Sequence, residues 1–177
     1  MRAPYSFYKN FKNLPNSIVD GIENAGPLSG ENMTPYDKSI RKRFFGMRWV
    51  SQQEQTPFGF LTPTDAAHYY LKDGSPRPCA YCGRIPEQNK VWGLDRIDPS
   101  RGYVPGNLVP ACSSHYEAPT LSCQGSRAKF TLLSWMERSM SRANGNPVPF
   151  AMVKQRLQRI YGLATQLAAE TRAAEKE

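Results

Sequence analysis

Long hydrophobic runs are missing from this sequence: its longest apolar stretches, such as Leu108–Ala111, are only a few residues long. A helix that spans a bilayer needs about 20 consecutive apolar residues, so we expect no membrane partner. The N-terminal residues also lack the continuous apolar stretch of a secretory signal, whereas a cleaved organellar presequence would leave no trace. We therefore expect an intracellular protein and leave its compartment open.

Cysteine and histidine are also scarce, with four and two copies among 177 residues. Four cysteines can form two disulfides in a secreted protein, but a Cys-x-x-Cys pair in a chain without a signal favours a metal site. Acidic residues are fewer than basic ones, 15 against 23, and the net charge of +8 favours a polyanionic partner such as nucleic acid. The length fits one ordinary domain, in which a small metal-bound unit carries helical extensions.

The basic residues gather in one predicted helix. Residues 1–36 hold scattered prolines and glycines without a sustained period, which predicts an irregular N-terminal arm. A basic helical segment follows at residues 37–76, and its first helix covers about residues 37–50. We expect its basic residues, with one from a later turn, to contact nucleic-acid phosphates: Lys38, Arg41, Lys42, Arg43, Arg48 and Arg101. The alternative is a basic face that contacts only solvent.

Three further helices are predicted before and after the centre of the chain. Thr62 and Pro63 can start a short helix that runs to about Lys72, before the sequence Asp-Gly-Ser-Pro breaks it. Residues 126–177 form the C-terminal helices, one over about 126–142 and a last one that begins near Pro149. His68 lies on the short helix, and we interpret it as a partly buried structural residue.

Two pairs of metal-binding side chains, each three residues apart, bracket the centre of the chain: Cys79 with Cys82, and Cys112 with His115. Gly83 relieves the first turn, as in a zinc knuckle. Three sulfurs and one imidazole can complete a tetrahedral site, so we predict a structural Zn²⁺. Cys123 is the alternative fourth ligand if the intervening loop folds back, and free thiols or a disulfide are the alternatives to a metal site.

Between the two pairs, the sequence contains Gly-Leu-Asp-Arg-Ile-Asp, Ser-Arg-Gly-Tyr and Gly-Asn-Leu-Val-Pro. Together with Cys-x-Tyr-Cys-Gly, these motifs resemble the HNH endonucleases common in phages and mobile introns. The resemblance covers about residues 79–116 and implies a zinc-bound ββα-metal core within residues 77–125. Residues 91–97 and 108–109 would then form the two strands, and Asn107 would tie down the loop between them. The expected fold class is α+β, a small zinc-stapled core with helical N- and C-terminal extensions.

The resemblance also implies which residues would carry catalysis. Asp95, at the end of the first strand, would hold Mg²⁺ or a similar divalent ion against the scissile phosphate. Arg96 stands where the family often has its general-base histidine; it cannot replace that base near neutral pH, but it can bind a phosphate oxygen. Tyr116 stands where relatives have a metal-ligating asparagine, so Glu117 would have to take that role. Asp98 either assists catalysis or caps the following turn, and we favour the cap.

Two functions follow from these motifs. The first is an HNH-type, homing or phage-like DNA endonuclease that hydrolyses phosphodiesters with Asp95, Arg96, Asn107 and Glu117; RNA is the alternative substrate. In that enzyme His115 can also act as a catalytic imidazole, if Cys123 closes the zinc site. The second is a catalytically degenerate HNH module that binds nucleic acid in a large assembly such as a ribosome. We take the endonuclease as the leading hypothesis; it would work in a host cytoplasm if phage-encoded, or in an organelle.

Overall fold

The computed structural model describes residues 20–22, 24–28, 32–112, 123, 130–144 and 149–174. Its elements, in chain order, are α2 (Asp37–Glu54), α3 (Ala67–Tyr70), β1 (Leu71–Lys72), β2 (Ser75–Pro76), β3 (Gly93–Arg96), the short 3₁₀ helix η2 (Pro99–Arg101), β4 (Leu108–Ala111), α5 (Leu132–Asn144) and α6 (Phe150–Ala174). Helices and two small antiparallel sheets agree with the expected α+β class. Among the described residues, none of the helices has the length and apolar character that a membrane span requires.

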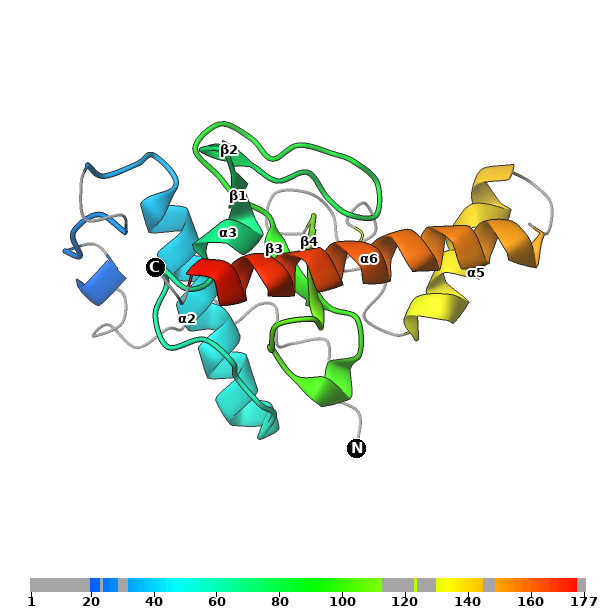
Figure 1. The fold of residues 1–177 in the computed structure, drawn as a ribbon, viewed down its shortest axis with the longest axis horizontal. Coiled ribbons are helices and arrows are strands. Elements are labelled where there is room, and N and C mark those ends of the chain that lie inside the picture. The colour runs from blue at the N-terminus through cyan, green and yellow to red at the C-terminus, as the bar shows by residue number, and fades with distance from the viewer. Residues whose placement is uncertain are drawn as a thin grey trace.

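The β3–β4 hairpin lies at the centre of the molecule, and α6 runs across it (Figure 1). The antiparallel register pairs Asp95 with Val109 and Arg96 with Leu108. Both strands were predicted from the sequence, and the structure places them within one or two residues of the expected bounds. At one end of α6 lies α2, and at the other α5 packs against it (Figure 1). The hairpin is therefore enclosed by helices from both halves of the chain.

The two faces of the hairpin enter two separate hydrophobic clusters. Because side chains alternate along a strand, Asp95 and Val109 share one face while their neighbours Arg96 and Leu108 share the other. Val109 packs into a cluster with the first cysteine turn, α5 and the N-terminal half of α6. Leu108 packs into a second cluster with α2, α3 and Leu167 near the end of α6. We call these the cysteine-side face and the α2-side face of the hairpin.

The loop that joins the two strands is fixed by Asn107. Its side-chain amide nitrogen donates to the carbonyl oxygens of Asp98 and Gly102, each at 2.8 Å, and its side-chain oxygen accepts from the Asp98 amide at 3.0 Å. Asn107 is fully buried, so these bonds are shielded from competing water. The structure thus confirms that Asn107 ties down this loop.

The three long helices follow the periodic patterns of the sequence. α2 begins at Asp37 as predicted and extends four residues beyond the expected end. α6 begins at Phe150, and its stripe of Val153, Ile160 and Leu167 is buried. Phe150, the first residue of the helix, is 63% exposed and lies outside this buried stripe. α5 begins at Leu132, later than the predicted start near residue 126, and residues 124–129 lie outside the described part of the chain.

The helix predicted from Thr62 to Lys72 is wrong over most of its length. Only Ala67–Tyr70 is helical, and the next residues form the β1–β2 hairpin instead. The two residues between these strands, Asp73 and Gly74, both have positive φ angles of 50° and 73°. Asp-Gly is a favoured pair for such a tight hairpin turn, so the sequence held the signal that ends this helix early.

Candidate metal centre

The first cysteine turn is fixed by main-chain hydrogen bonds. The Gly83 amide donates to the Cys79 carbonyl oxygen at 2.8 Å, and the Cys79 amide donates to the Arg84 carbonyl oxygen at the same distance. Gly83 has a φ angle of 77°, in the left-handed region that glycine tolerates without strain. The Ala80 amide donates to the carbonyl oxygen of Pro110 in β4 at 2.8 Å. The turn is therefore attached directly to the β3–β4 hairpin.

Four cysteines from the segments before β3 and after β4 come together: Cys79, Cys82, Cys112 and Cys123. Their sulfur atoms all lie within 4.8 Å of one another, and none of the four forms a disulfide. The sulfurs of Cys82 and Cys112 are 3.9 Å apart. Ligands of a tetrahedral Zn²⁺ at about 2.3 Å would be about 3.8 Å apart, so this spacing fits such an ion. The cluster can hold a metal ion.

The thiols perturb one another within this cluster. Hydrogen bonds with the thiols of Cys112 and Cys123 hold the pKa of Cys79 well below its usual value. Hydrogen bonds with the thiols of Cys112 and Cys79 raise the pKa of Cys123, and burial raises it further. The Cys79 sulfur thus accepts hydrogen bonds from neighbouring thiols, and a divalent metal ion that binds such a cluster displaces the thiol protons.

The fourth member of the cluster is Cys123, the alternative ligand considered from the sequence. Its main-chain amide also donates to the Cys112 sulfur at 3.2 Å, the kind of contact that stabilises a thiolate. His115, the other predicted fourth ligand, lies outside the described residues, as do Tyr116 and Glu117. The roles predicted for those three residues stay predictions.

Asp95 lies on the cysteine-side face and is held by the first cysteine turn. The hydroxyl of Tyr81, between Cys79 and Cys82, donates to the Asp95 carboxylate at 2.5 Å. Asp95 is 9% exposed and Tyr81 is 4% exposed. The Tyr81 ring also packs edge-on against Trp135 of α5, and its carbonyl oxygen accepts from Arg156 of α6 at 2.7 Å. The candidate catalytic carboxylate is thus enclosed by residues of its own chain.

Arg96 points to the opposite, α2-side face of the hairpin. Its guanidinium forms an ion pair with Glu54 at the end of α2, with an N–O distance of 2.6 Å. The same group lies 4.7 Å from the centre of the Tyr103 ring, in a cation–π contact. Arg96 and Asp95 are adjacent in sequence, but they contact different parts of the protein.

Asp98 has the structural role that we favoured from the sequence. Its carboxylate accepts from the Ser100 amide at 2.9 Å and so caps η2. His68 is likewise structural: its ring nitrogen Nε2 lies 2.8 Å from the Thr171 hydroxyl of α6. Burial lowers the pKa of His68 and so favours its neutral form.

The predicted phosphate-binding residues have different degrees of exposure. Lys38, Lys42 and Arg48 are exposed on α2, and Arg101 is exposed in η2. Arg41 is half-buried and donates to the carbonyl oxygen of Gly26 in the N-terminal arm. Arg43 is only 8% exposed, because it lies on the core side of α2. We therefore correct its assignment: Arg43 is a core residue of this structure and leaves the set of candidate phosphate contacts.

Sequence reasoning missed two side chains at this site, Tyr81 and Glu54. Tyr81 was visible as the central aromatic residue of Cys-x-Tyr-Cys, but its contact with Asp95 follows only from the folded turn. Glu54 lies 42 residues before Arg96, and no sequence signal links the two.

Comparisons with family models, with curated proteins and with solved structures found no match to this chain.

Proposed function

We propose that this protein binds nucleic acid through an HNH-like core that a structural Zn²⁺ holds together. Four cysteine sulfurs suit Zn²⁺, which accepts four thiolates in tetrahedral geometry. We propose Cys123, whose sulfur lies in the cluster, as the fourth ligand in place of His115. The net charge of +8 and the exposed Lys38, Lys42 and Arg48 on α2 support a polyanionic partner.

The observation that carries a binding role without hydrolysis is the contact between Tyr81 and Asp95. A catalytic Mg²⁺ retains several water molecules and needs open space around its carboxylate ligand. Asp95 is nearly buried, and one of its carboxylate oxygens already accepts the Tyr81 hydroxyl. Arg96, at the position of the family's general base, is engaged by Glu54. The geometry therefore favours the degenerate module, a structural nucleic-acid-binding protein of a larger assembly, with DNA or RNA as the partner.

A metal-dependent DNA endonuclease is the second candidate. Its support is the position of Asp95 on β3, next to the cysteine cluster, together with the loop that Asn107 fixes, as the HNH resemblance implies. In this case the Tyr81 hydroxyl would leave Asp95 when substrate and Mg²⁺ bind. This candidate needs a base from residues outside the described part of the chain.

Nicking of supercoiled plasmid with Mg²⁺ or Mn²⁺ separates the two candidates. We expect the wild-type protein to retard plasmid or a structured RNA in a gel without cutting either. Cutting that the Asp95→Ala variant loses would overturn the binding-only role and select the endonuclease. A wild-type protein that binds neither DNA nor RNA would overturn both. Asp98→Ala is the matched control, because this exposed carboxylate caps η2 and should not affect cutting.

A further inference from the structure

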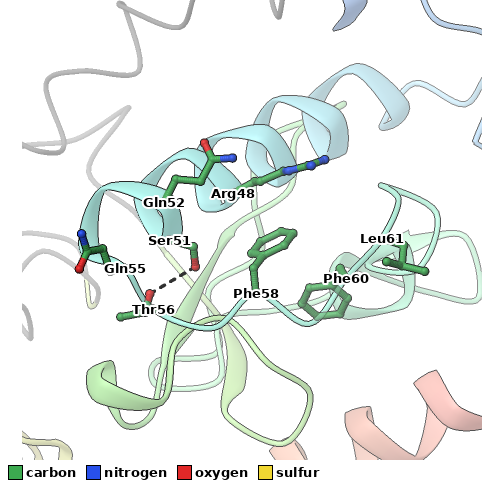
Figure 2. A pocket seen from close by; sticks show the side chains of 8 residues that line it. All are labelled: Arg48, Ser51, Gln52, Gln55, Thr56, Phe58, Phe60 and Leu61. Atoms are coloured by element: carbon green, nitrogen blue, oxygen red, sulfur yellow. Dashed lines mark hydrogen bonds between the residues drawn. The ribbon is translucent and has the colours of Figure 1, made fainter.

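A cleft of about 410 Å³ lies on the α2 side of the molecule, away from the cysteine cluster. It is bounded by the C-terminal half of α2 and by residues 56–61, which follow that helix. Arg48 and Gln52 contribute from α2 and Gln55 from its C-terminal cap, and Phe58, Phe60 and Leu61 contribute from the following segment (Figure 2). Of the predicted catalytic residues that the structure describes, none lines this cleft.

The aromatic side of the cleft is held rigidly. The Phe58 ring packs edge-on against Phe44 and Phe60, with ring centres 5.4 and 5.8 Å apart. Phe60 in turn packs edge-on against Tyr69, and it is only 4% exposed. Phe58 is half-buried, so part of its ring remains available at the cleft. Such a ring can act as a stacking surface whose orientation is fixed before a ligand arrives.

The backbone of this segment is anchored to the loop of the β3–β4 hairpin. The Tyr103 amide donates to the Pro57 carbonyl oxygen, and the Gly59 amide donates to the Tyr103 carbonyl oxygen, both at 2.9 Å. A Cβ atom at Gly102 would lie 2.2 Å from the Pro57 oxygen, so only glycine allows this approach. The φ angle of Gly102 is 71°, which also favours glycine. The stacking surface is thus part of the folded core.

The other side of the cleft is polar and positively charged. Arg48, Gln52 and Gln55 are exposed, and Ser51 below them is fixed by its bond to the Pro57 carbonyl oxygen at 3.2 Å. Arg48 and Gln52 are one helical turn apart, so they project from the same side of α2. The exposed Lys38 and Lys42 continue the positive charge along the same helix toward its N-terminus. This side offers one fixed charge and two amide groups.

We propose that this cleft binds one unpaired base of a nucleic-acid strand, stacked on Phe58 with its phosphate at Arg48. A base presents a flat apolar face, a hydrogen-bonding edge and an attached anion. The cleft presents an aromatic ring, a guanidinium and two amide side chains, one group for each of these features. The inference rests on the proposed nucleic-acid-binding function and adds to it that the partner has a single-stranded or flipped-out nucleotide.

Fluorescence titration of the full-length protein tests this proposal with 2-aminopurine placed in two oligonucleotides. One is single-stranded, and the other has the same sequence in a blunt, fully paired duplex. Movement of the probe from its neighbouring bases onto Phe58 should raise its fluorescence in the single strand. Phe58→Leu keeps an apolar side chain but removes the ring, and it should weaken single-strand binding about 5- to 150-fold, the loss expected for one stacked base. Duplex binding should change less than twofold.

Two further variants keep the test valid if Phe58→Leu does not fold. Gln52→Ala and Arg48→Ala change exposed side chains only, and each should weaken single-strand binding more than it weakens duplex binding. The matched controls are Tyr161→Leu and Arg159→Ala, which remove an exposed ring and an exposed charge from α6. The controls should leave the ratio of the two affinities unchanged.

Three results would overturn the proposal. Equal losses for both oligonucleotides would make the cleft a general phosphate-binding surface, and no loss for either would remove it from the interface. Both results leave the proposed nucleic-acid binding intact. A wild-type protein that binds neither oligonucleotide nor plasmid would overturn this inference and the proposed function together.

Discussion

The two faces of the β3–β4 hairpin are stabilised in different ways. On the cysteine-side face, the core includes Cys79 and Cys112 with Cys123 packed against it, so three of the four sulfurs that can share one metal ion form part of its packing. On the α2-side face, the core consists of aliphatic and aromatic side chains such as Ile40, Phe44 and Tyr70. With the proposed Zn²⁺, the first face depends on an ion that the chain must acquire. The second depends on helix packing and on the burial of apolar surface, to which the Arg96–Glu54 ion pair adds.

The two residues to which the HNH resemblance assigns catalytic positions lie on different faces. Asp95 points to the cysteine-side face, where its carboxylate accepts a hydrogen bond from Tyr81 of the first cysteine turn. Arg96 points to the α2-side face and is paired with a helix from the N-terminal half of the chain. Both side chains of this pair therefore contribute to holding elements together, and this is why we favour binding over hydrolysis.

The largest expected effect on stability is the loss of a cysteine from the cysteine-side face. Cys79→Ser should remove most of the metal-binding free energy, which is on the order of 10 kcal/mol for structural zinc and comparable to the whole stability of a domain. We expect loss of the cooperative thermal transition measured by circular dichroism. Chelation of the wild-type metal should reproduce this loss, and added Zn²⁺ should reverse it. A variant that binds no metal but still unfolds in the cooperative transition of the wild type would contradict the proposal that a metal ion stabilises the cysteine-side face.

The Tyr81–Asp95 contact should give the next largest effect. Tyr81→Phe leaves a nearly buried carboxylate without this donor, which should lower the free energy of unfolding by about 1–3 kcal/mol. The measurement is urea unfolding at neutral pH. The matched control is Tyr161→Phe on α6, because this ring is 51% exposed and its loss of a hydroxyl should cost less than about 0.5 kcal/mol. Equal stability of the two variants would mean that Tyr81 does not hold Asp95.

The Arg96–Glu54 ion pair should give a smaller effect on the α2-side face. Its side chains are 13% and 24% exposed, so Glu54→Gln should lower the unfolding free energy by about 1 kcal/mol. Lys90 and Glu87 form a comparison pair, 34% and 61% exposed, where Glu87→Gln should cost less than about 0.5 kcal/mol. The measurement is unfolding at low and at high salt. High salt should abolish the stability loss caused by Glu87→Gln but not the loss caused by Glu54→Gln. Equal losses of unfolding free energy for the two variants at both salt concentrations would mean that solvent screens the Arg96–Glu54 pair as strongly as the exposed pair.

Much of the fold was predictable because its signals are local. Periodic apolar residues marked α2, α5 and α6, and β-forming residues beside turn residues marked β3 and β4. Of the two fourth ligands left open by the sequence, Cys123 lies in the cluster. The β1–β2 hairpin was missed because the helix signals at Thr62 and Pro63 were given more weight than Asp73-Gly74.

The contacts that distinguish binding from catalysis were not predictable from the sequence. Strand alternation places Asp95 and Arg96 on opposite faces, but it does not say what covers each face. The partners came from distant segments: Tyr81 lies in the cysteine turn, and Glu54 lies at the end of α2. Likewise, the burial of Arg43 depends on which side of α2 meets the core. Because basic residues occur over much of the surface of α2, their pattern in the sequence did not indicate that side.

Metal analysis of the purified protein tests the central claim most directly. Inductively coupled plasma mass spectrometry should find one zinc per chain in the wild type. The Cys123→Ser variant should bind zinc more weakly and lose it to a chelator that the wild type resists, whereas His115→Ala should retain it. A wild-type chain without bound transition metal would contradict the account, and so would a chain whose zinc is lost with His115 and kept without Cys123.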